Sequence, residues 1–407
     1  MNKNVIVGQS GGPTSVINAS LAGVFAQAKA ANLGTIYGMR NGIKGFLERR
    51  NIDMGQYIKD EIDIEILKRT PSSFLGSCRY KLPKIEDNEE VYHQIFQILD
   101  EMSIGYFFYI GGNDSMDTIM KLSTYGEAKG SPIRFIGVPK TIDNDLAVTD
   151  HSPGFGSAAK YIAATIKEMV LDAQVYNNGA VTIVEVMGRN TGWLAGSAAL
   201  ARGVDSLGPD LIFLPEITFN VDSFLDKVAK ISSSNAAATI VVSEGIKLAD
   251  GRYVNEIAAE NNTVDAFGHK QLSGTASYLS QEVHRNLGVK TRAVEFSIIQ
   301  RCAAHLQSAT DVTEAFAVGA DGVKAAISGL TNRVIIIKRL SSEPYAFGTD
   351  AMEIEKMANI EKNVPMEWVT QSRDDVTKDF IEYARPLIQG EVAPYFVNGL
   401  PRHIRLP

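Results

Sequence analysis

A lysine, a hydroxyl and two carboxylates lie within six consecutive residues, from Lys140 to Asp145. An apolar run, Phe135-Ile136-Gly137-Val138, precedes them and is typical of a buried strand. One carboxylate of such a group can act as base to a hydroxyl while the other holds a divalent cation. Phosphoryl transfer needs that combination, together with positive charge on the transferred group. A solvated polar turn also collects Asp and Asn, so the segment alone leaves both interpretations open.

A glycine-rich segment near the N-terminus, Gly8-Gln9-Ser10-Gly11-Gly12, lies between an apolar strand pattern and a helical pattern. Glycines let the backbone approach an anion, and a helix N-terminus offers free N–H groups and partial positive charge. The spacing is neither G-x-G-x-x-G nor G-x-x-x-x-G-K-[ST], which speaks against a dinucleotide fold and a P-loop ATPase. It predicts a phosphate-binding turn, with a tight packing turn as the alternative.

The segment Gly111-Gly112-Asn113-Asp114-Ser115 repeats this arrangement of strand, glycines and helix. A carboxylate there would repel a phosphate: two unit charges about 4 Å apart interact by about 4 kcal/mol at an effective dielectric near 20. We therefore expect a magnesium ion or a cation beside Asp114. Lys140, at the end of a separate strand, is the partner that we predict.

The C-terminal half supplies further cations. Arg189 follows Met187-Gly188, and Arg292 and Arg301 flank an expected strand. The guanidinium fork suits the geometry of phosphate. A lone arginine is more often an ordinary surface residue, so these three are candidate site residues only together with the motifs beside them.

Short apolar strands alternate with helical patterns, which predicts α/β lobes with parallel sheets covered on both faces. The expected strands are 4–7, 105–110, 135–138, 180–186, 211–214 and 238–242, and the expected helices are 15–31, a helix from near Met116, 191–201 and 221–230. A late strand at 331–338 is expected to return to the first lobe, and the tail from about Ser341 to wrap around with one or two helices. Because parallel sheets bind ligands at the carboxyl ends of their strands, the polar clusters predict one shared cleft between the lobes.

Composition narrows the class of protein. The 407 residues are 45% hydrophobic and 21% charged, with a net charge of −7 and no basic segment, which argues against nucleic acid as a partner. No apolar run is long enough to span a bilayer, and the N-terminus shows no signal-peptide pattern. Two cysteines cannot form a disulfide framework. We therefore expect a cytoplasmic protein with no membrane contact.

Taken together and in order, these motifs resemble the phosphofructokinase family from Ser10 to Arg301. The motifs that carry the resemblance are Ser10-Gly11-Gly12, Leu75-Gly76-Ser77-x-Arg79, Gly111-Gly112-x-Asp114-Ser115, Pro139-Lys140-Thr141-Ile142-Asp143-Asn144-Asp145, Met187-Gly188-Arg189, Pro215-Glu216, Ser243-Glu244-Gly245, Thr291-Arg292 and Gln300-Arg301. The resemblance implies two Rossmann-like lobes with mostly parallel sheets and an active site in the cleft between them. It also implies phosphoryl transfer to the 1-hydroxyl of fructose 6-phosphate.

The resemblance predicts a domain division as well. Residues 1–154 plus about 302–360 would form a larger lobe that binds the donor phosphates and magnesium. Residues 155–301 would form a smaller lobe that binds the sugar phosphate, and 361–407 a C-terminal wrapping segment.

Site roles follow from the matched motifs. Asp143 would be the base on the sugar hydroxyl, assisted by Thr141 and Arg189 as further catalytic residues. The donor-binding residues would be Gly12, Arg79, Gly112, Asp114, Ser115 and Lys140, and the sugar-phosphate-binding residues Met187, Gly188, Arg189, Glu244, Arg292 and Arg301. Asn113 and Asp145 would hold Mg²⁺. In the family one such arginine reaches in from a neighbouring subunit, and Arg292 matches that position, which implies a homodimer or homotetramer.

The donor is predicted from two positions. ATP-using members typically have glycine where this chain has Asp114 and Lys140. Both residues are typical of the pyrophosphate-dependent branch, in which the reaction is reversible because phosphate is released. A carboxylate at position 114 would also repel the α-phosphate of ATP. The alternatives are an ATP-dependent 6-phosphofructokinase and a non-catalytic regulatory subunit that binds sugar phosphate; a general base such as Asp143 argues against the latter.

The chain departs from the family pattern at a few positions. Asn113 stands where most members have an acidic magnesium ligand, although an asparagine oxygen can still bind a hard cation. Ile298 and Ala180 replace residues that usually contact sugar phosphate, which places more weight on Arg292 and Arg301. His151 follows the aspartate-rich segment, and a structural role is favoured for it over lining the cleft.

Overall fold

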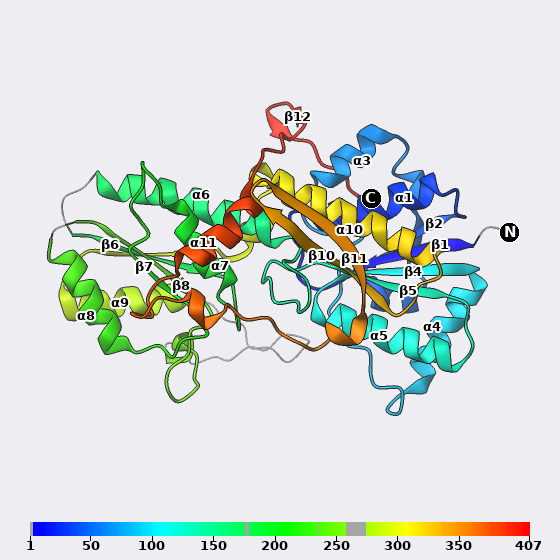
Figure 1. Ribbon diagram of the computed structural model, residues 1–407, viewed down its shortest axis with the longest axis horizontal. Helices are drawn as coiled ribbons and strands as arrows, with labels where there is room; N and C mark the ends of the chain where they lie inside the picture. Colours follow the sequence, from blue (N-terminus) through cyan, green and yellow to red (C-terminus); the bar gives the residue numbers. More distant parts are fainter. Residues whose placement is uncertain (1–2, 176–178, 235, 258–273) are drawn as a thin grey trace. The chain divides into compact units, whose positions relative to one another are not determined.

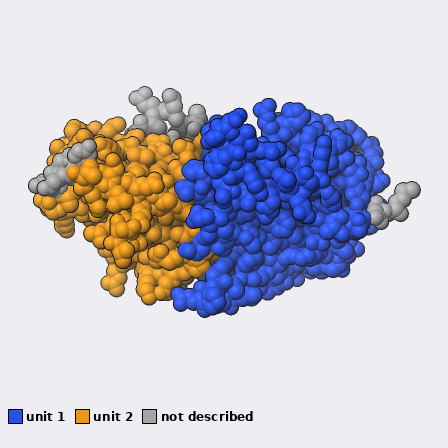
Figure 2. Space-filling view, turned by 90° about the horizontal axis from the view of Figure 1, so that it is seen from above, with its two compact units in different colours: residues 1–157, 301–361, 389–407 blue, residues 158–300, 362–388 orange. Residues whose placement is uncertain are grey.

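The computed structural model describes residues 3–407 except 176–178, 235 and 258–273. This part of the chain forms two compact units, coloured in Figure 2. Unit 1 contains residues 1–157, 301–361 and 389–407, and unit 2 contains residues 158–300 and 362–388. The chain therefore crosses between the units several times, and its C-terminal tail contributes to both.

A seven-stranded sheet in the order β11-β10-β5-β4-β1-β2-β3 forms the centre of unit 1 (Figure 1). Its strands are β1 (Asn4–Gln9), β2 (Ile36–Met39), β3 (Asn51–Asp53), β4 (Ile104–Gly111), β5 (Arg134–Pro139), β10 (Arg333–Ser342) and β11 (Tyr345–Glu353). The five strands from β10 to β2 run parallel, whereas β3 and β11 pair antiparallel at the two edges.

Helices cover both faces of this sheet, as its apolar strands require. The α-helices of unit 1 are α1 (Ile17–Ala30), α2 (Gly42–Leu47), α3 (Glu61–Lys68), α4 (Glu89–Glu101), α5 (Asn113–Ala128) and α10 (Ala309–Ile327). Phe107 and Tyr109 of β4 join the core under α4 and α5, whereas Phe108 and Ile110 join the core under α1 and α10. Alternate residues of a strand point to opposite faces, so one apolar run serves two cores.

Two glycines allow α1 and α10 to pack closely against each other. A Cβ atom on Gly23 would lie 2.1 Å from the carbonyl oxygen of Phe316, and one on Gly319 would lie 2.1 Å from that of Ser20. Neither position can accept a side chain without separating the helices. This contact fixes α10 against the sheet.

Unit 2 contains a four-stranded parallel sheet in the order β7-β8-β6-β9. Its strands are β6 (Val181–Val186), β7 (Leu211–Phe213), β8 (Ala238–Ser243) and β9 (Thr291–Glu295), and its α-helices are α6 (Phe155–Gln174, which begins in unit 1), α7 (Trp193–Ser197), α8 (Val221–Ser232), α9 (Thr275–Leu287) and α11 (Lys378–Ala384). Phe224 and Val228, one helical turn apart on α8, are buried against this sheet.

The structure confirms the predicted α/β class with two mainly parallel sheets. The late strand does return to the first lobe, as β10 beside β5. One expectation was wrong in detail, since α5 begins at Asn113 rather than near Met116. The tail after Ser341 contains an α-helix, α11, as expected, and in addition a strand, β11, that was not expected. In the described part of the chain, no helix is long and apolar enough to cross a membrane.

Candidate active site

The predicted donor segments meet at one edge of the unit 1 sheet. Parallel strands β1, β4 and β5 are neighbours, and the segments that begin at Gly8, Gly111 and Lys140 follow their carboxyl ends. Strand β2, which follows β1 in the chain, lies on one side of β1, and β4 lies on the other side. The strand order therefore reverses between β1 and β4, which makes this position a topological switch point. Such a point is where open α/β sheets bind ligands.

The first glycine segment is held by a second loop that carries Arg79. Gly11 has a φ of +76°, which a side chain would strain. Its carbonyl oxygen accepts a hydrogen bond of 2.6 Å from the hydroxyl of Ser77. The Ser10 hydroxyl in turn donates to the carbonyl of Cys78. These bonds bring the exposed Arg79 to the glycine segment, 67 positions away from Gly12 in the sequence.

Lys140 is buried, with 2% of its surface exposed, beside the same glycine segment. Its Nζ donates a 2.7 Å hydrogen bond to the carbonyl oxygen of Gly12. Burial lowers the pKa of Lys140 to about 8, and Asp143 and Asp145 partly offset that effect. A buried ammonium with spare donors is a strong site for an anion.

The predicted pair between Lys140 and Asp114 is not formed. Among the described residues, the ammonium bonds to Gly12, and no ion pair joins it to Asp114. Asp114 lies instead in the first turn of α5, where the helix dipole stabilises a carboxylate. The neighbouring Ser115 is buried, and a Cβ atom on Gly111 would lie 1.9 Å from its hydroxyl oxygen, so this turn is closely packed.

The aspartate-rich segment forms a turn in which Asp143 stays partly exposed. The backbone N–H of Asp143 donates to the hydroxyl of Thr141 at 3.1 Å. Asn144, between the two aspartates, has a φ of +53° and is fully buried. Its side-chain oxygen accepts a 2.9 Å bond from the N–H of Ser152. Asp143 is therefore accessible to a substrate while the turn beneath it is fixed.

Two orphaned oxygens fit the predicted metal site. The Oδ1 atoms of Asn113 and Asp145 are both buried without a hydrogen-bond partner. Burial, followed by the charges of Asp143 and Glu361, raises the pKa of Asp145 to about 7. Within the described residues no group of three or more His, Cys, Asp or Glu could hold a metal by itself. This suits Mg²⁺, which usually takes one or two protein ligands and completes its shell with water and phosphate oxygens.

Unit 2 places the predicted sugar-phosphate residues at the ends of two adjacent strands. Met187, Gly188 and Arg189 follow β6, and Glu244 follows β8. The Ser243 hydroxyl donates to the carbonyl of Gly188 at 2.5 Å. Gly188 has a φ of +130°, and a Cβ atom on Gly245 would lie 1.9 Å from the Arg189 carbonyl oxygen, so glycine is required where these turns touch.

Two predicted arginines lie in different surroundings. Arg292 is exposed on edge strand β9, and the carboxylate of Asp172 is 3.9 Å from its guanidinium. Arg301 belongs to unit 1, where a Cβ atom on Gly12 would lie 3.2 Å from its Nη1. The structure thus places Arg301 beside the donor segment, and its expected contact with the sugar phosphate stays a prediction.

The sequence motifs included Ser243 and Gln300, but we assigned no role to either residue, and both hold the unit 2 turns. Ser243 bonds to Gly188, and the side-chain oxygen of Gln300 accepts a 3.2 Å bond from the N–H of Met187. Each lies directly before a predicted site residue, Glu244 or Arg301, and this position in the sequence could have indicated a supporting role.

The two mainly parallel sheets, with glycines and charged side chains at the carboxyl ends of their strands, define an α/β protein of the phosphofructokinase-like class. The model of the phosphofructokinase family matches residues 4–326, and the chain belongs to this family.

Similar proteins share both sequence and fold with this chain. A pyrophosphate--fructose 6-phosphate 1-phosphotransferase of Methylococcus capsulatus is 40% identical over 408 residues, covering 99% of this chain and 96% of that protein. One of Xanthomonas campestris pv. campestris is 41% identical over 409 residues, covering 100% and 96%. The crystal structure of a pyrophosphate-dependent phosphofructokinase from Nitrosospira multiformis matches with a TM-score of 0.89 at 38% identity, covering 99% of this chain and 96% of that one.

Proposed function

We propose that this chain catalyses the reversible transfer of a phosphoryl group from pyrophosphate to the 1-hydroxyl of fructose 6-phosphate. The observation that carries the proposal is the buried ammonium of Lys140, which lies against Gly12 where ATP-using relatives typically have a small glycine. A cation in that place neutralises a compact diphosphate. Relatives named for this activity, similar over nearly the full length, support the same donor.

Unit 1 would bind the donor. Lys140 and Arg79 would contact the phosphates, the backbone at Gly12 and Gly112 would supply N–H groups, and the Ser115 hydroxyl would be a further donor. Asp143 would then accept the proton of the sugar hydroxyl, with Thr141 fixing the turn that presents it. Because phosphoryl transfer requires little covalent chemistry from the protein, positioning and charge would supply most of the catalysis.

Asn113 and Asp145 would hold Mg²⁺ through their orphaned oxygens. The ion would neutralise charge on the phosphates that it shares with the protein. Asp114 would then lie near the magnesium ion rather than near Lys140. The charge of the ion would offset the repulsion expected between the Asp114 carboxylate and the donor phosphates.

Unit 2 would bind the acceptor. Arg189 and Glu244, presented by adjacent strand ends together with Met187 and Gly188, suit a phosphorylated sugar with several hydroxyl groups. Arg292 is exposed on an edge strand, as an arginine shared between subunits of a homodimer or homotetramer would be. Arg301 would also bind the sugar phosphate.

One assay tests the proposal. The purified protein is given fructose 6-phosphate and Mg²⁺, with pyrophosphate or ATP offered separately. We expect turnover with pyrophosphate and Asp143→Ser to lose several orders of magnitude in kcat with little change in sugar-phosphate binding. Turnover with ATP alone would favour the ATP-dependent alternative, and a protein that binds fructose 6-phosphate without turnover would be the regulatory alternative.

A further inference from the structure

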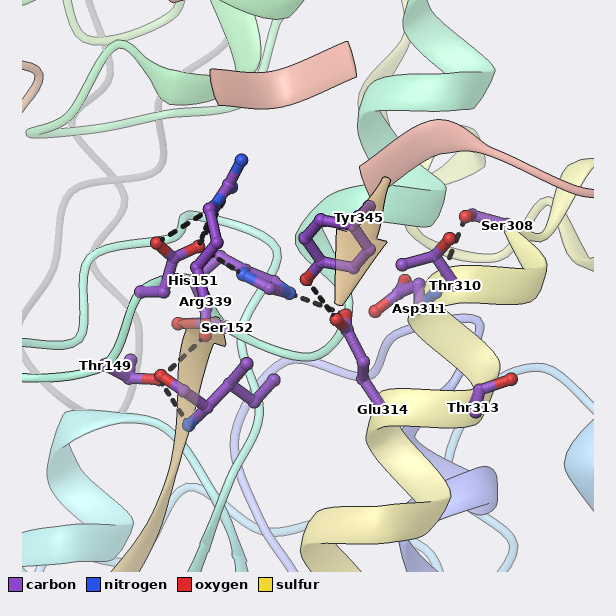
Figure 3. Close-up of polar contacts among 12 residues, drawn as sticks. Thr149, His151, Ser152, Ser308, Thr310, Asp311, Thr313, Glu314, Arg339 and Tyr345 are labelled. Atoms are coloured by element: carbon purple, nitrogen blue, oxygen red, sulfur yellow. Dashed lines mark hydrogen bonds and ion pairs between the residues drawn. The ribbon is translucent and has the colours of Figure 1, made fainter. Parts of the chain in front are cut away.

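Figure 3 shows a group of charged side chains in unit 1 that is centred on the buried His151. The Nδ1 of His151 is 2.8 Å from a carboxylate oxygen of Asp150, and its Nε2 is 2.6 Å from one of Glu314 on α10. The side chains of His151 and Glu314 are each only 1% exposed. A carboxylate can only accept, so a hydrogen on each ring nitrogen, as in an imidazolium, satisfies both contacts.

Two neighbouring strands, β10 and β11, hold this group in place. Arg339 of β10 donates to both carboxylate oxygens of Asp150, and the hydroxyl of Tyr345 on β11 donates to Glu314. Burial alone would lower the pKa of His151, but Glu314 and Asp150 raise it to about 9. The charges of two carboxylates are therefore balanced by one imidazolium and one guanidinium.

The same helix holds the chain directly after His151. Asp311, one turn before Glu314 on α10, accepts bonds of 2.9 Å from the N–H of Gly154 and 2.8 Å from that of Ser157. The segment 150–157 is thus fixed to α10 at several points. This segment is the return path of the turn that begins at Thr141, whose N–H donates to the carbonyl of Pro153.

The side chain of Asn144 connects the return path to the segment that carries the two aspartates. Asn144, between Asp143 and Asp145, accepts its bond from the N–H of Ser152, the residue next to His151. Val148, within the same turn, has a φ of +57°, which is costly for a β-branched residue and requires the surroundings to enforce it. The turn is therefore held in its shape by contacts outside it.

We propose that the ion pair between His151 and Glu314 is a positioning device that sets the orientation of Asp143 and Asp145 through Ser152 and Asn144. The inference rests on the proposed function, because it assigns these aspartates a role in phosphoryl transfer. His151 and Glu314 act through the turn and touch no substrate. Their contribution belongs to kcat rather than to substrate binding, which other residues provide.

Two variants interrupt the connection at different points. Glu314→Gln removes one of the two charges facing His151 while keeping the size of the side chain. Asn144→Gly removes the bond to Ser152, tolerates the positive φ and keeps every residue of the charged group. Asp375→Asn is the control, because it breaks the ion pair with Arg202 in unit 2 and leaves the turn alone.

We expect kcat with pyrophosphate to fall about 10- to 100-fold in both variants, while KM for either substrate changes less than about threefold. The control should keep kcat. The decrease in kcat of Glu314→Gln should become larger between pH 7 and 9. In this variant only the carboxylate of Asp150 favours the protonated form of His151, so the ring loses its proton at a lower pH. Asp311, Arg339 and Tyr345, which also face the group, are kept in the variant.

A folded variant with wild-type kcat, or a loss that appears in KM instead, would overturn the positioning role. If Glu314→Gln does not fold, Asn144→Gly still decides the question. Nitrogen NMR of the wild-type ring gives a readout independent of turnover: a neutral His151 at pH 7 would contradict the ion pair. An inactive wild type would overturn the proposed function, and this inference with it; an active wild type with unaffected variants would overturn the inference alone.

Discussion

Raising the pH from 7 to 9 should weaken the use of pyrophosphate because Lys140 loses its charge. Burial lowers the pKa of this ammonium to about 8 in the free protein. Its charged fraction then falls from about nine tenths at pH 7 to about one tenth at pH 9. Since kcat/KM reports the ionisation of the free enzyme, we expect kcat/KM for pyrophosphate to fall about tenfold over this interval.

The free energy of unfolding, in contrast to kcat/KM, should increase as the pH is raised from 7 to 9. The folded pKa of Lys140, about 8, lies below the ordinary lysine value of 10.5, because burial penalises the charged form. The contribution of this group to stability is therefore present above the unfolded pKa and is lost as the pH falls towards 8. A shift of this size corresponds to about 3 kcal/mol. Activity that declines while urea unfolding shows no loss of stability would separate titration from unfolding.

Two variants complete the test. Lys140→Arg keeps its charge at every pH used, so its kcat/KM should stay level from pH 7 to 9 whatever its absolute value. Lys140→Met should have a low kcat/KM for pyrophosphate that is equally independent of pH. The same tenfold decline in Lys140→Arg would assign the titration to another group or to pyrophosphate itself, and a level wild-type profile would refute the role of Lys140.

Three further predictions follow from the site and the core. The double variant Asp114→Gly with Lys140→Gly should accept ATP, measured as kcat/KM for each nucleotide and for pyrophosphate; normal pyrophosphate use without any ATP use would contradict the assignment of donor choice to these residues. Asn113→Asp should lower the Mg²⁺ concentration needed for half-maximal rate, because a carboxylate replaces an amide at the orphaned oxygen. Gly319→Ala should destabilise the protein by about 1–3 kcal/mol in urea unfolding, because the new Cβ would meet the carbonyl of Ser20; an unchanged midpoint would show that α1 and α10 can separate freely.

The order of the elements could be predicted from the sequence because it depends on local patterns. Apolar runs of strand length, such as the one before Lys140, alternate with helical spacing, and parallel strands follow from that alternation. The site motifs could be found for the same reason: Lys140, Asp143 and the glycines lie directly at strand ends, where chemistry is expected. Strand β11 was missed because its edge position leaves it half-exposed, without a continuous apolar run.

The sequence by itself determined which residue types stand at the strand ends, and with them the class of fold and the family. Only the tertiary structure decided which of those residues meet. It directed Lys140, at the end of β5, past the neighbouring strand β4 to the carbonyl of Gly12 rather than to Asp114. A buried ammonium requires a hydrogen-bond acceptor, and that carbonyl supplies one. It also joined His151 to Glu314, 163 positions further along the chain, since a pairing between distant residues depends on how helices pack and leaves no periodic pattern in the sequence.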